Sequence, residues 1–382
     1  MKRFLALLLA VCMFALCGCR SETPEDTVPE TQPTTAPTQP STAPTQPSET
    51  QPPVTEPTEY TGKYNPLTGE KIEGDGLLRP IAVVLNNTKS DLPQYGVSDA
   101  DIVYEALIEG ETRMLGVFYD VLATSGKFLG TVRSARYYFV QIAQGYDAIY
   151  VHNGGSSDSE IGAYNYFEKT GWPHMDAITS PGGSKYYENP NGGTNLTGKV
   201  VIRPQKILDF AKALGIKTTR EEPLNTGMKF DDDAVTIGKS GISAKVWFNM
   251  SGKPNAQWTK STSFTYNEAD KLYYASQYGS DYVDGNDNTQ VSFRNVLVLR
   301  TAISQKTDTN TNPADRLLYV NTTGSGTGYF LCNGQMLEIN WSREKVTDPF
   351  QYTLASNGEP ITFGVGKTYV AFVPNKAQVD IA

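Results

Sequence analysis

The sequence predicts an α+β protein, in which an N-terminal mixed α/β domain is followed by a C-terminal, mostly antiparallel β domain. Three observations support this prediction. Between about residues 62 and 225, short apolar runs alternate with helix-type segments bounded by capping residues. From 226 to 382, the chain is a series of short runs rich in aromatic and β-branched residues. An apolar leader at 1–19 and a proline-rich tether at 20–61 precede both domains.

The first 19 residues are typical of a lipoprotein signal peptide. Lys2 and Arg3 precede an apolar run at 4–16, which is too short to span a bilayer as a mature helix. The run ends in LCGC, which resembles a bacterial lipobox, and the resemblance implies that Cys19 is lipidated. The alternative is an ordinary secretory signal with chance cysteines. Because two or more acyl chains anchor a protein stably, we expect it at the outer face of the cell membrane.

Cysteine usage and composition characterise the chain beyond the leader. If Cys19 is lipidated and the leader is removed, Cys332 alone remains, so the mature protein forms no internal disulfide. Residues 20–61 repeat Thr, Pro, Gln and Ser, a composition that does not fold. In a polyproline conformation, about 40 residues reach on the order of 120 Å. We expect this tether to hold the folded part away from the membrane.

The charge of the chain excludes one class of partner. The formal net charge is −8, and seven of the acidic residues lie in the tether. The folded part therefore holds 34 acidic and 30 basic residues, a net charge of −4. Nonspecific nucleic-acid binding requires a basic face, so no nucleic-acid partner is predicted. A local basic pocket remains compatible with this balance.

The first half begins with a strand and a hairpin. The run IAVVLNN at 81–87 is typical of a buried strand. Residues 101–109 alternate, which places Glu105 and Glu109 together on one strand face. The next strand pattern follows Gly110 directly, so the two runs are predicted to form a hairpin.

Three helices are predicted after the hairpin. The first follows Ser134 as its N-cap and stops at Gly145. A strand at 147–153 separates it from the second helix, for which Ser157 and Glu160 form a capping box. The third runs over 203–214, with a proline in its first turn and a glycine after its last.

The second half is predicted to consist of short strands. The Asn333-Gly334 and Asn357-Gly358 pairs are signals for two-residue hairpins. The Gly-rich run at 323–330 matches no nucleotide-binding pattern and is predicted to be a turn or a bulge. The predicted strand runs are 241–250, 263–276, 291–302, 316–324, 327–341, 351–363 and 367–374.

Five segments of the chain resemble a known family. They are NPLTGE, RPIAVVLNN, SDADIVYEALIEGETRMLGVFYD, GTVRSARYYFVQIAQGYDAIYVHNGGS and NTTGSGTGYFLCNGQMLEINW. The chain resembles the YerB-like lipoproteins of Gram-positive bacteria over most of residues 65–374. The resemblance implies an exported lipoprotein with a two-part domain of unknown function, and it implies no activity. Thr194 stands where the family pattern has a histidine, so a catalytic scheme that needs this histidine does not transfer.

The stretch TVRSARYYF suggests a site for an anion. Free N–H groups at a helix start and two guanidiniums bind carboxylates or phosphates. If the strands before the first two helices are neighbours, the loop after the second strand forms the opposite wall. The alternative is that an arginine pairs with Glu105 or Glu109 and braces the hairpin; both can hold together. The predicted ligand-binding residues are Arg133, Ser134, Arg136, His152, Asn153, Gly154, Gly155 and Ser156, with Glu105 and Glu109 as orienting groups.

Catalytic and metal sites find weaker support. A Ser134–His152 nucleophile pair, oriented by Asp147 or Asp158, lacks a G-x-S-x-G elbow. His152, His174 and Asp176 lack the spacing of a metal site. Glu105 and Glu109 would lie about 13 Å apart on a strand, too far for a glycosidase pair. No metal and no cofactor are predicted. The many tyrosines of the first half suit a carbohydrate-facing surface or, more simply, the edge of the core.

These observations predict a lipid-anchored, non-catalytic protein that binds an anionic ligand or partner of the cell envelope. One alternative is a hydrolase or transferase that acts on a cell-wall polymer through His152. Another is a scaffold that binds an envelope protein through its β domain. An open pocket at Arg133, Arg136 and His152 would favour binding or catalysis, whereas burial of both arginines against glutamates would favour the scaffold.

Overall fold

The computed structural model describes residues 63–192, 199–251, 260–306 and 316–382. These residues belong to one compact unit that begins at Glu56. The predicted leader, the tether, Cys19 and Thr194 lie outside the described residues. Within the described ranges, no helix is long and apolar enough to cross a membrane.

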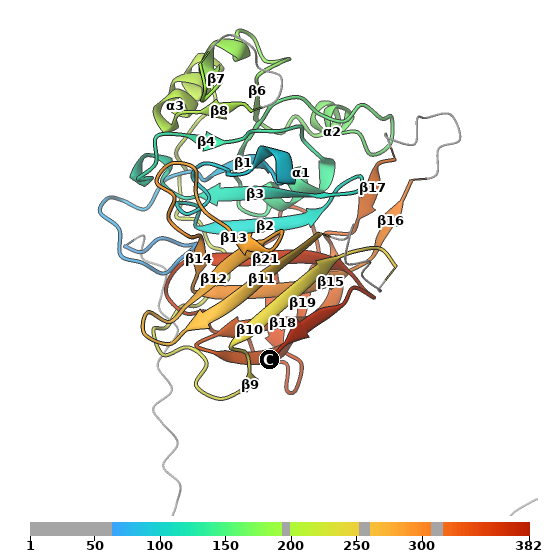
Figure 1. Cartoon of the computed structure of the whole chain (residues 1–382). Helices are drawn as coiled ribbons and strands as arrows, with labels where there is room; N and C mark the ends of the chain where they lie inside the picture. The colour runs from blue at the N-terminus through green and yellow to red at the C-terminus, as the bar shows by residue number, and fades with distance from the viewer. Residues whose placement is uncertain (1–62, 193–198, 252–259, 307–315) are drawn as a thin grey trace, which may run out of the picture. The chain divides into compact units, whose positions relative to one another are not determined.

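The main sheet is mixed and has eleven strands (Figure 1). Its order is β20-β19-β18-β15-β21-β2-β3-β1-β5-β6, and β9 also pairs with β19. From the first half come β1 (Ile81–Asn86), β2 (Ile102–Leu107), β3 (Thr112–Phe118), β5 (Ile149–His152) and β6 (His174–Asp176). From the second half come β9 (Lys239–Ser240), β15 (Asn295–Thr301), β18 (Gly324–Cys332), β19 (Gln335–Arg343), β20 (Gln351–Leu354) and β21 (Thr368–Pro374).

Strand β21 joins the two halves. It pairs in parallel with β2 on one side and with β15 on the other, so Tyr369 lies level with both Val103 and Val296. The strand pairs β1/β5 and β5/β6 are also parallel. The predicted division at residue 225/226 falls before β9, and strands from both sides of it enter the main sheet.

A second, antiparallel sheet has six strands and belongs to the C-terminal part. With the mixed main sheet and few helices, it confirms the predicted α+β class. The strands are β10 (Ser243–Phe248), β11 (Lys260–Asn267), β12 (Leu272–Gln277), β13 (Ser280–Asp281), β14 (Ser292–Phe293) and β22 (Val379–Ile381). The remaining small sheets are formed by β4 (Leu129–Gly130), β7 (Tyr187–Glu188) and β8 (Val201–Ile202), and by β16 (Ile303–Gln305) and β17 (Leu318–Val320).

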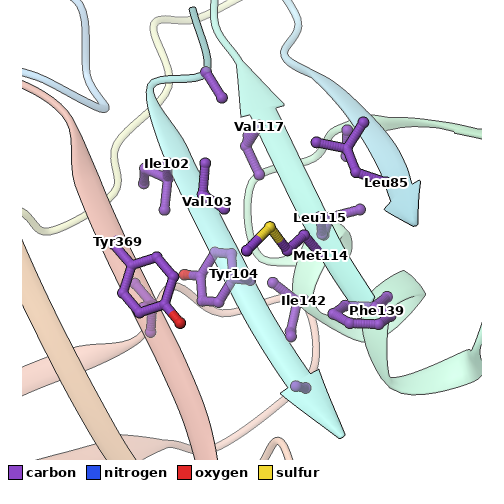
Figure 2. Packing of buried hydrophobic residues seen from close by; sticks show 14 of the residues in the cluster. Leu85, Ile102, Val103, Tyr104, Met114, Leu115, Val117, Phe139, Ile142 and Tyr369 are labelled. Atoms are coloured by element: carbon purple, nitrogen blue, oxygen red, sulfur yellow. The ribbon is translucent and has the colours of Figure 1, made fainter. Parts of the chain in front are cut away.

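Both faces of the main sheet are covered at β2, all of whose residues are buried (Figure 2). On one face, Tyr104 lies next to Tyr146, which follows the helix α1 (Tyr137–Gln144). On the other face, the ring of Tyr369 lies 4.7 Å from that of Phe264 in β11. The strand is therefore one apolar run interrupted by Glu105, as expected for a strand buried on both sides.

Two predicted helix starts are wrong. Helix α1 begins at Tyr137 with Arg136 as N-cap, not after Ser134. The reason is that residues 133–135 are held in extended pairing with neighbouring strands and loops. Helix α2 (Ala163–Thr170) begins six residues after Ser157, and the Oγ of Ser156 accepts the N–H of Ala163. Helix α3 (Pro204–Ala213) begins and ends one residue inside the predicted range 203–214, and Gly215 after it has φ +69°.

The hairpin predicted at Asn333-Gly334 is confirmed, whereas the turn predicted at 323–330 is wrong. The Asn333-Gly334 pair connects β18 to β19 with φ angles of 53° and 70°, as a type I′ hairpin requires. Asn357-Gly358 closes a turn on an isolated bridge between Thr353 and Pro360. The prediction of a turn or bulge at 323–330 is wrong, because these residues enter β18. A Cβ at Gly326 would lie 2.3 Å from the carbonyl oxygen of Arg300, so this glycine permits close packing rather than a turn.

Candidate functional site

The segment at Arg133–Ala135 lies directly against the loop after β5. The N–H of Arg133 donates to Val84 of β1, and its carbonyl accepts the N–H of Asn153. Ala135 donates to the carbonyl of Gly154 and accepts from Ser156. The structure therefore brings together Arg133, Ser134, Asn153, Gly154, Gly155 and Ser156, as the sequence suggested.

Gly154 is needed where these two segments meet. Its φ is +78°, a conformation that other residues rarely adopt. A Cβ at this position would lie 3.2 Å from Ile178 and 3.4 Å from the Oγ of Ser134. The backbone of the loop consequently lies within van der Waals distance of Ser134.

Arg136 is paired. Its Nε and Nη2 donate to the two carboxylate oxygens of Glu109 at 2.9 and 2.6 Å, and both side chains are nearly buried, at 13% and 11% exposure. Although burial acts to raise it, the hydrogen bonds and charge of Arg136 hold the pKa of Glu109 below its usual value. This ion pair braces the turn after β2. Such bracing is the alternative to ligand binding that the sequence suggested for an arginine in this stretch.

Arg113, which the sequence reasoning missed, completes an arginine cluster with Arg133 and Arg136. It lies in β3, is 5% exposed, and donates from Nη1 to the carbonyl of Ser134 at 2.6 Å. Burial, together with the positive charges of Arg136 and Arg133, lowers the pKa of Arg113 to about 10. The signal in the sequence was a lone charged residue inside the apolar run TRMLGVF.

The arginine cluster has donors without acceptors. The Nε atoms of Arg113 and Arg133 are buried and find no partner among the described residues. Within the same ranges, Glu109 is the one carboxylate that forms an ion pair with any of these three guanidiniums. The cluster therefore carries three positive charges against the one carboxylate of Glu109, and only Arg113 among the three arginines is fully buried.

Glu105 does not belong to this cluster. Its carboxylate lies 3.1 Å from the Nζ of Lys260, and both side chains are buried. Four further donors bind its oxygens: Asn87, Thr112, Thr262 and Tyr369. The prediction that Glu105 and Glu109 share a strand face is wrong, because β2 ends at Leu107 and Glu109 lies in the turn beyond it.

His152 is buried and fully engaged. Its Nδ1 lies 2.7 Å from the carbonyl oxygen of Gly154, and its Nε2 lies 2.9 Å from Nδ1 of His174. A carbonyl can only accept, so Nδ1 of His152 holds a proton and Nε2 accepts from His174. Burial lowers the pKa of His152 below its usual value, and burial and the neighbouring His152 lower that of His174 to about 4. The pair is therefore neutral at pH 7.

These contacts leave no free ring nitrogen on His152 for Ser134. Asp176 is equally occupied, since it accepts from Tyr164, Thr179 and the N–H of Gly154. Within the described residues, no group of three or more His, Cys, Asp or Glu side chains is placed to hold a metal. The side chains of His152 and Asp176 hold the loop through hydrogen bonds to the carbonyl and the N–H of Gly154, and His174 bonds to His152.

Comparison with known protein families identifies the family of this chain. The model described as "Protein of unknown function (DUF3048) N-terminal domain" matches residues 67–216, and the corresponding C-terminal domain matches residues 254–370. The chain belongs to the DUF3048 family. The "Putative lipoprotein YerB" of Bacillus subtilis (strain 168) is 26% identical over 330 residues, which cover 83% of this chain and 88% of that protein. The resemblance predicted from the sequence is thereby confirmed.

A solved structure of a DUF3048 relative shares the fold. The crystal structure of the YerB protein from Bacillus subtilis aligns with a TM-score of 0.66 and 26% identity, over 83% of this chain and 99% of that one. The name of the relative includes the word lipoprotein, which agrees with the predicted lipobox. Neither name states an activity or a ligand.

Two cavities of this DUF3048 protein lie away from the arginine cluster. One of about 530 Å³ is bordered by Tyr64, Lys71 and Phe230. Another of about 300 Å³ lies between Pro93, which follows the short helix η1 (Lys89–Asp91), and the end of β12. Neither cavity is lined by Arg113, Arg133, Arg136 or His152, so the open pocket that the sequence analysis required for binding or catalysis is not found at either of these two cavities.

Proposed function

We propose that this DUF3048 protein is a lipid-anchored, extracytoplasmic binding module that recognises an anionic ligand at the arginine cluster. The proposal rests on Arg133, a partly exposed residue that forms no ion pair among the described residues and adds its positive charge to that of the buried Arg113. A guanidinium without a counter-charge attracts an anion and can donate its N–H groups to acceptor oxygens. Carboxylates and phosphates both present such oxygens in pairs.

Arg133, rather than Arg136, is the arginine whose substitution tests this proposal. Arg136 already gives two donors to Glu109, so its removal would unpair a buried carboxylate and confuse a binding assay with a loss of stability. Arg133 has an unpaired Nε and forms no ion pair among the described residues. Arg133 is therefore the residue whose loss should abolish binding while the fold persists.

A thermal-shift experiment on residues 56–382 tests the proposal. Phosphate, citrate and acetate are compared with potassium chloride at equal ionic strength. We expect at least one multivalent anion to raise the melting temperature, and Arg133→Gln to abolish that rise. Arg300→Gln serves as the control, because Arg300 donates to the carbonyls of Asn375 and Ala377 at the C-terminal half of the sheet. Equal shifts in the wild type and Arg133→Gln would contradict the proposal.

A further inference from the structure

We propose that the side chains of Lys260 and Asn87 react to form a covalent amide bond, with Glu105 as the proton carrier. Lys260 begins β11 in the six-stranded sheet, and Asn87 follows β1 in the main sheet. The product is a cross-link between the two sheets. None of these residues belongs to the arginine cluster, so the modification is independent of the proposed anion binding.

Glu105 brings the two reacting side chains together. Its Oε1 accepts from Nδ2 of Asn87 at 3.0 Å and lies 3.1 Å from Nζ of Lys260. Asn87 and Glu105 are fully buried, and Lys260 is 6% exposed. Because both nitrogen atoms contact the same oxygen, Nζ lies near Nδ2 and near the Cγ atom to which Nδ2 is bonded. The reactants are therefore held next to each other in a place from which bulk water is excluded.

The surroundings of Lys260 favour the reactive form of its amine. An amine attacks a carbonyl group only when it is neutral. Burial lowers the pKa of Lys260 below its usual value, although the charge of Glu105 acts to raise it. The rings of Tyr278 and Phe248 lie 5.0 and 5.8 Å from Nζ. Transfer of a proton from Nζ to Glu105 replaces two buried charges by two neutral groups, so burial favours the nucleophile.

The amide of Asn87 is held as the electrophile. Its Oδ1 accepts from Nε2 of Gln94 at 2.8 Å. When Nζ adds to Cγ, negative charge develops on Oδ1, and this hydrogen bond stabilises that charge. The Nδ2 atom also donates to Thr112 at 2.9 Å, which fixes the orientation of the amide group.

The atoms and electrons of the reaction balance without a further reactant. Glu105 accepts one proton from the Lys260 ammonium, and the neutral amine forms a bond to Cγ of Asn87. Glu105 then gives this proton to Nδ2 and accepts a second proton from Nζ, while the bond between Cγ and Nδ2 breaks. The products are a secondary amide, a protonated Glu105 and one molecule of ammonia.

Such a bond would stabilise a protein that lacks the usual covalent link. Cys332 is the one cysteine among the described residues, so no disulfide forms between them. An amide between positions 87 and 260 constrains the unfolded chain as a disulfide does, and reducing agents do not break it.

Intact-mass spectrometry of the denatured chain, from residue 20 onward, tests the proposal. We expect a mass about 17 Da below the value calculated from the sequence, because one molecule of ammonia is lost. Digestion with trypsin should give a branched peptide that joins residues 72–89 to residues 246–271, since trypsin does not cleave after an acylated lysine. The measurement does not depend on how well the protein folds after purification, because the bond persists on denaturation.

Two variants and one control identify the reacting residues. Lys260→Arg keeps a positive charge beside Glu105 but offers no amine, and Asn87→Ala removes the electrophile, so both should have their calculated masses. Lys245→Arg, on the neighbouring strand β10, should keep the loss of ammonia. A wild-type chain at its calculated mass would overturn the proposal. A loss that persists in Lys260→Arg would also overturn it, since a succinimide at an Asn-Gly pair releases ammonia as well.

Discussion

Glu105 and Glu109 are four residues apart, yet their carboxylates bind partners from different parts of the fold. Glu105 faces the six-stranded sheet and meets Lys260 and Thr262 of β11. Glu109 lies beyond the end of β2 and binds Arg136 at the start of α1. One short segment thus supplies an acid to each of two buried ion pairs, and each pair can be tested separately.

The Arg136–Glu109 pair should show strong coupling. Arg136→Met leaves Glu109 nearly buried without a counter-charge, and we expect a loss of about 2–4 kcal/mol in the free energy of unfolding. Adding Glu109→Gln removes that unpaired charge and should restore most of the loss. Urea denaturation of the two single variants and the double variant measures the coupling. The half-exposed Arg203–Glu188 pair is the control, where Arg203→Met should cost less than about 1 kcal/mol. Additive losses at Arg136 and Glu109 would contradict this prediction.

Breaking the Lys260–Glu105 pair should lower the free energy of unfolding more than breaking the Arg136–Glu109 pair. Lys260→Met leaves a carboxylate buried between two sheets, so a loss of roughly 3–5 kcal/mol is expected by chemical denaturation. Lys239→Met breaks an exposed pair with Glu338, whose side chains are 71% and 55% exposed, and should leave stability nearly unchanged. If the two lysine variants lose equal stability, burial does not control the strength of these pairs.

The lowered pKa values of His152 and His174 predict that the free energy of unfolding falls as the pH is lowered. The pKa of His174 falls to about 4 in the folded protein, against an ordinary value near 6.5, and that of His152 is also lowered. Between pH 4 and pH 6.5 the unfolded chain therefore binds more protons, so the stability from this pair is present above pH 6.5 and is lost on acidification. We expect a decline on the order of 2 kcal/mol across this window.

The pH effect is checked by denaturation curves at intervals between pH 7.5 and pH 4.5. In His174→Asn the decline should shrink, because the amide keeps a donor for His152 and does not titrate. Asp101 acts in the opposite direction, since burial raises its pKa to about 6 and its folded form takes up a proton as the pH falls. The difference between wild type and His174→Asn removes this common background. An identical pH dependence in the two proteins would contradict the prediction.

Alanine substitutions at two turn glycines, Gly334 and Gly358, distinguish the cost of backbone strain from the cost of a steric clash. Gly334 and Gly358 have φ angles of +70° and +78°, so an alanine at either position costs about 1 kcal/mol in backbone strain. A Cβ at Gly334 would also lie 2.9 Å from the ring of Tyr266, whereas one at Gly358 meets nothing within 4 Å. Gly334→Ala should therefore lower the melting temperature more than Gly358→Ala. In a Tyr266→Ala background, Gly334→Ala should lower the melting temperature no more than Gly358→Ala does. If Gly334→Ala still lowers it more in that background, contact with Tyr266 is not the cause of the difference.

Local signals in the sequence predicted the elements that depend on local chemistry. The strand at Ile81–Asn86, the hairpin at Gly110, the Asn333-Gly334 turn and the limits of α3 are all set by residues within a few positions. The start of α1 was misplaced because tertiary pairing of residues 133–135 with the Gly154 loop overrides the capping preference of Ser134. The start of α2 was misplaced because Asp158, not Ser157, accepts the N–H groups of Glu160 and Ile161, in a turn that precedes the helix.

The site was predictable only in part. The meeting of the Arg133 segment with the Gly154 loop is expected for two strand-to-helix connections at one edge of the sheet. The partners of Glu105 were not predictable, since Lys260 lies 155 positions away and reaches it from the second sheet. Arg113 stands out in the sequence as a charged residue inside an apolar run, but its missing hydrogen bond appears only in three dimensions.

The position of β21 has a consequence for the order in which the protein can be completed. This strand, residues 368–374, is the parallel neighbour of both β2 and β15. A chain that emerges from its N-terminus displays β2 with one edge unpaired until residues 368–374 are available. The finished sheet must therefore close late, around a strand that arrives last. A stop before Thr368 would remove β21 and leave a gap at the centre of the sheet rather than a frayed margin.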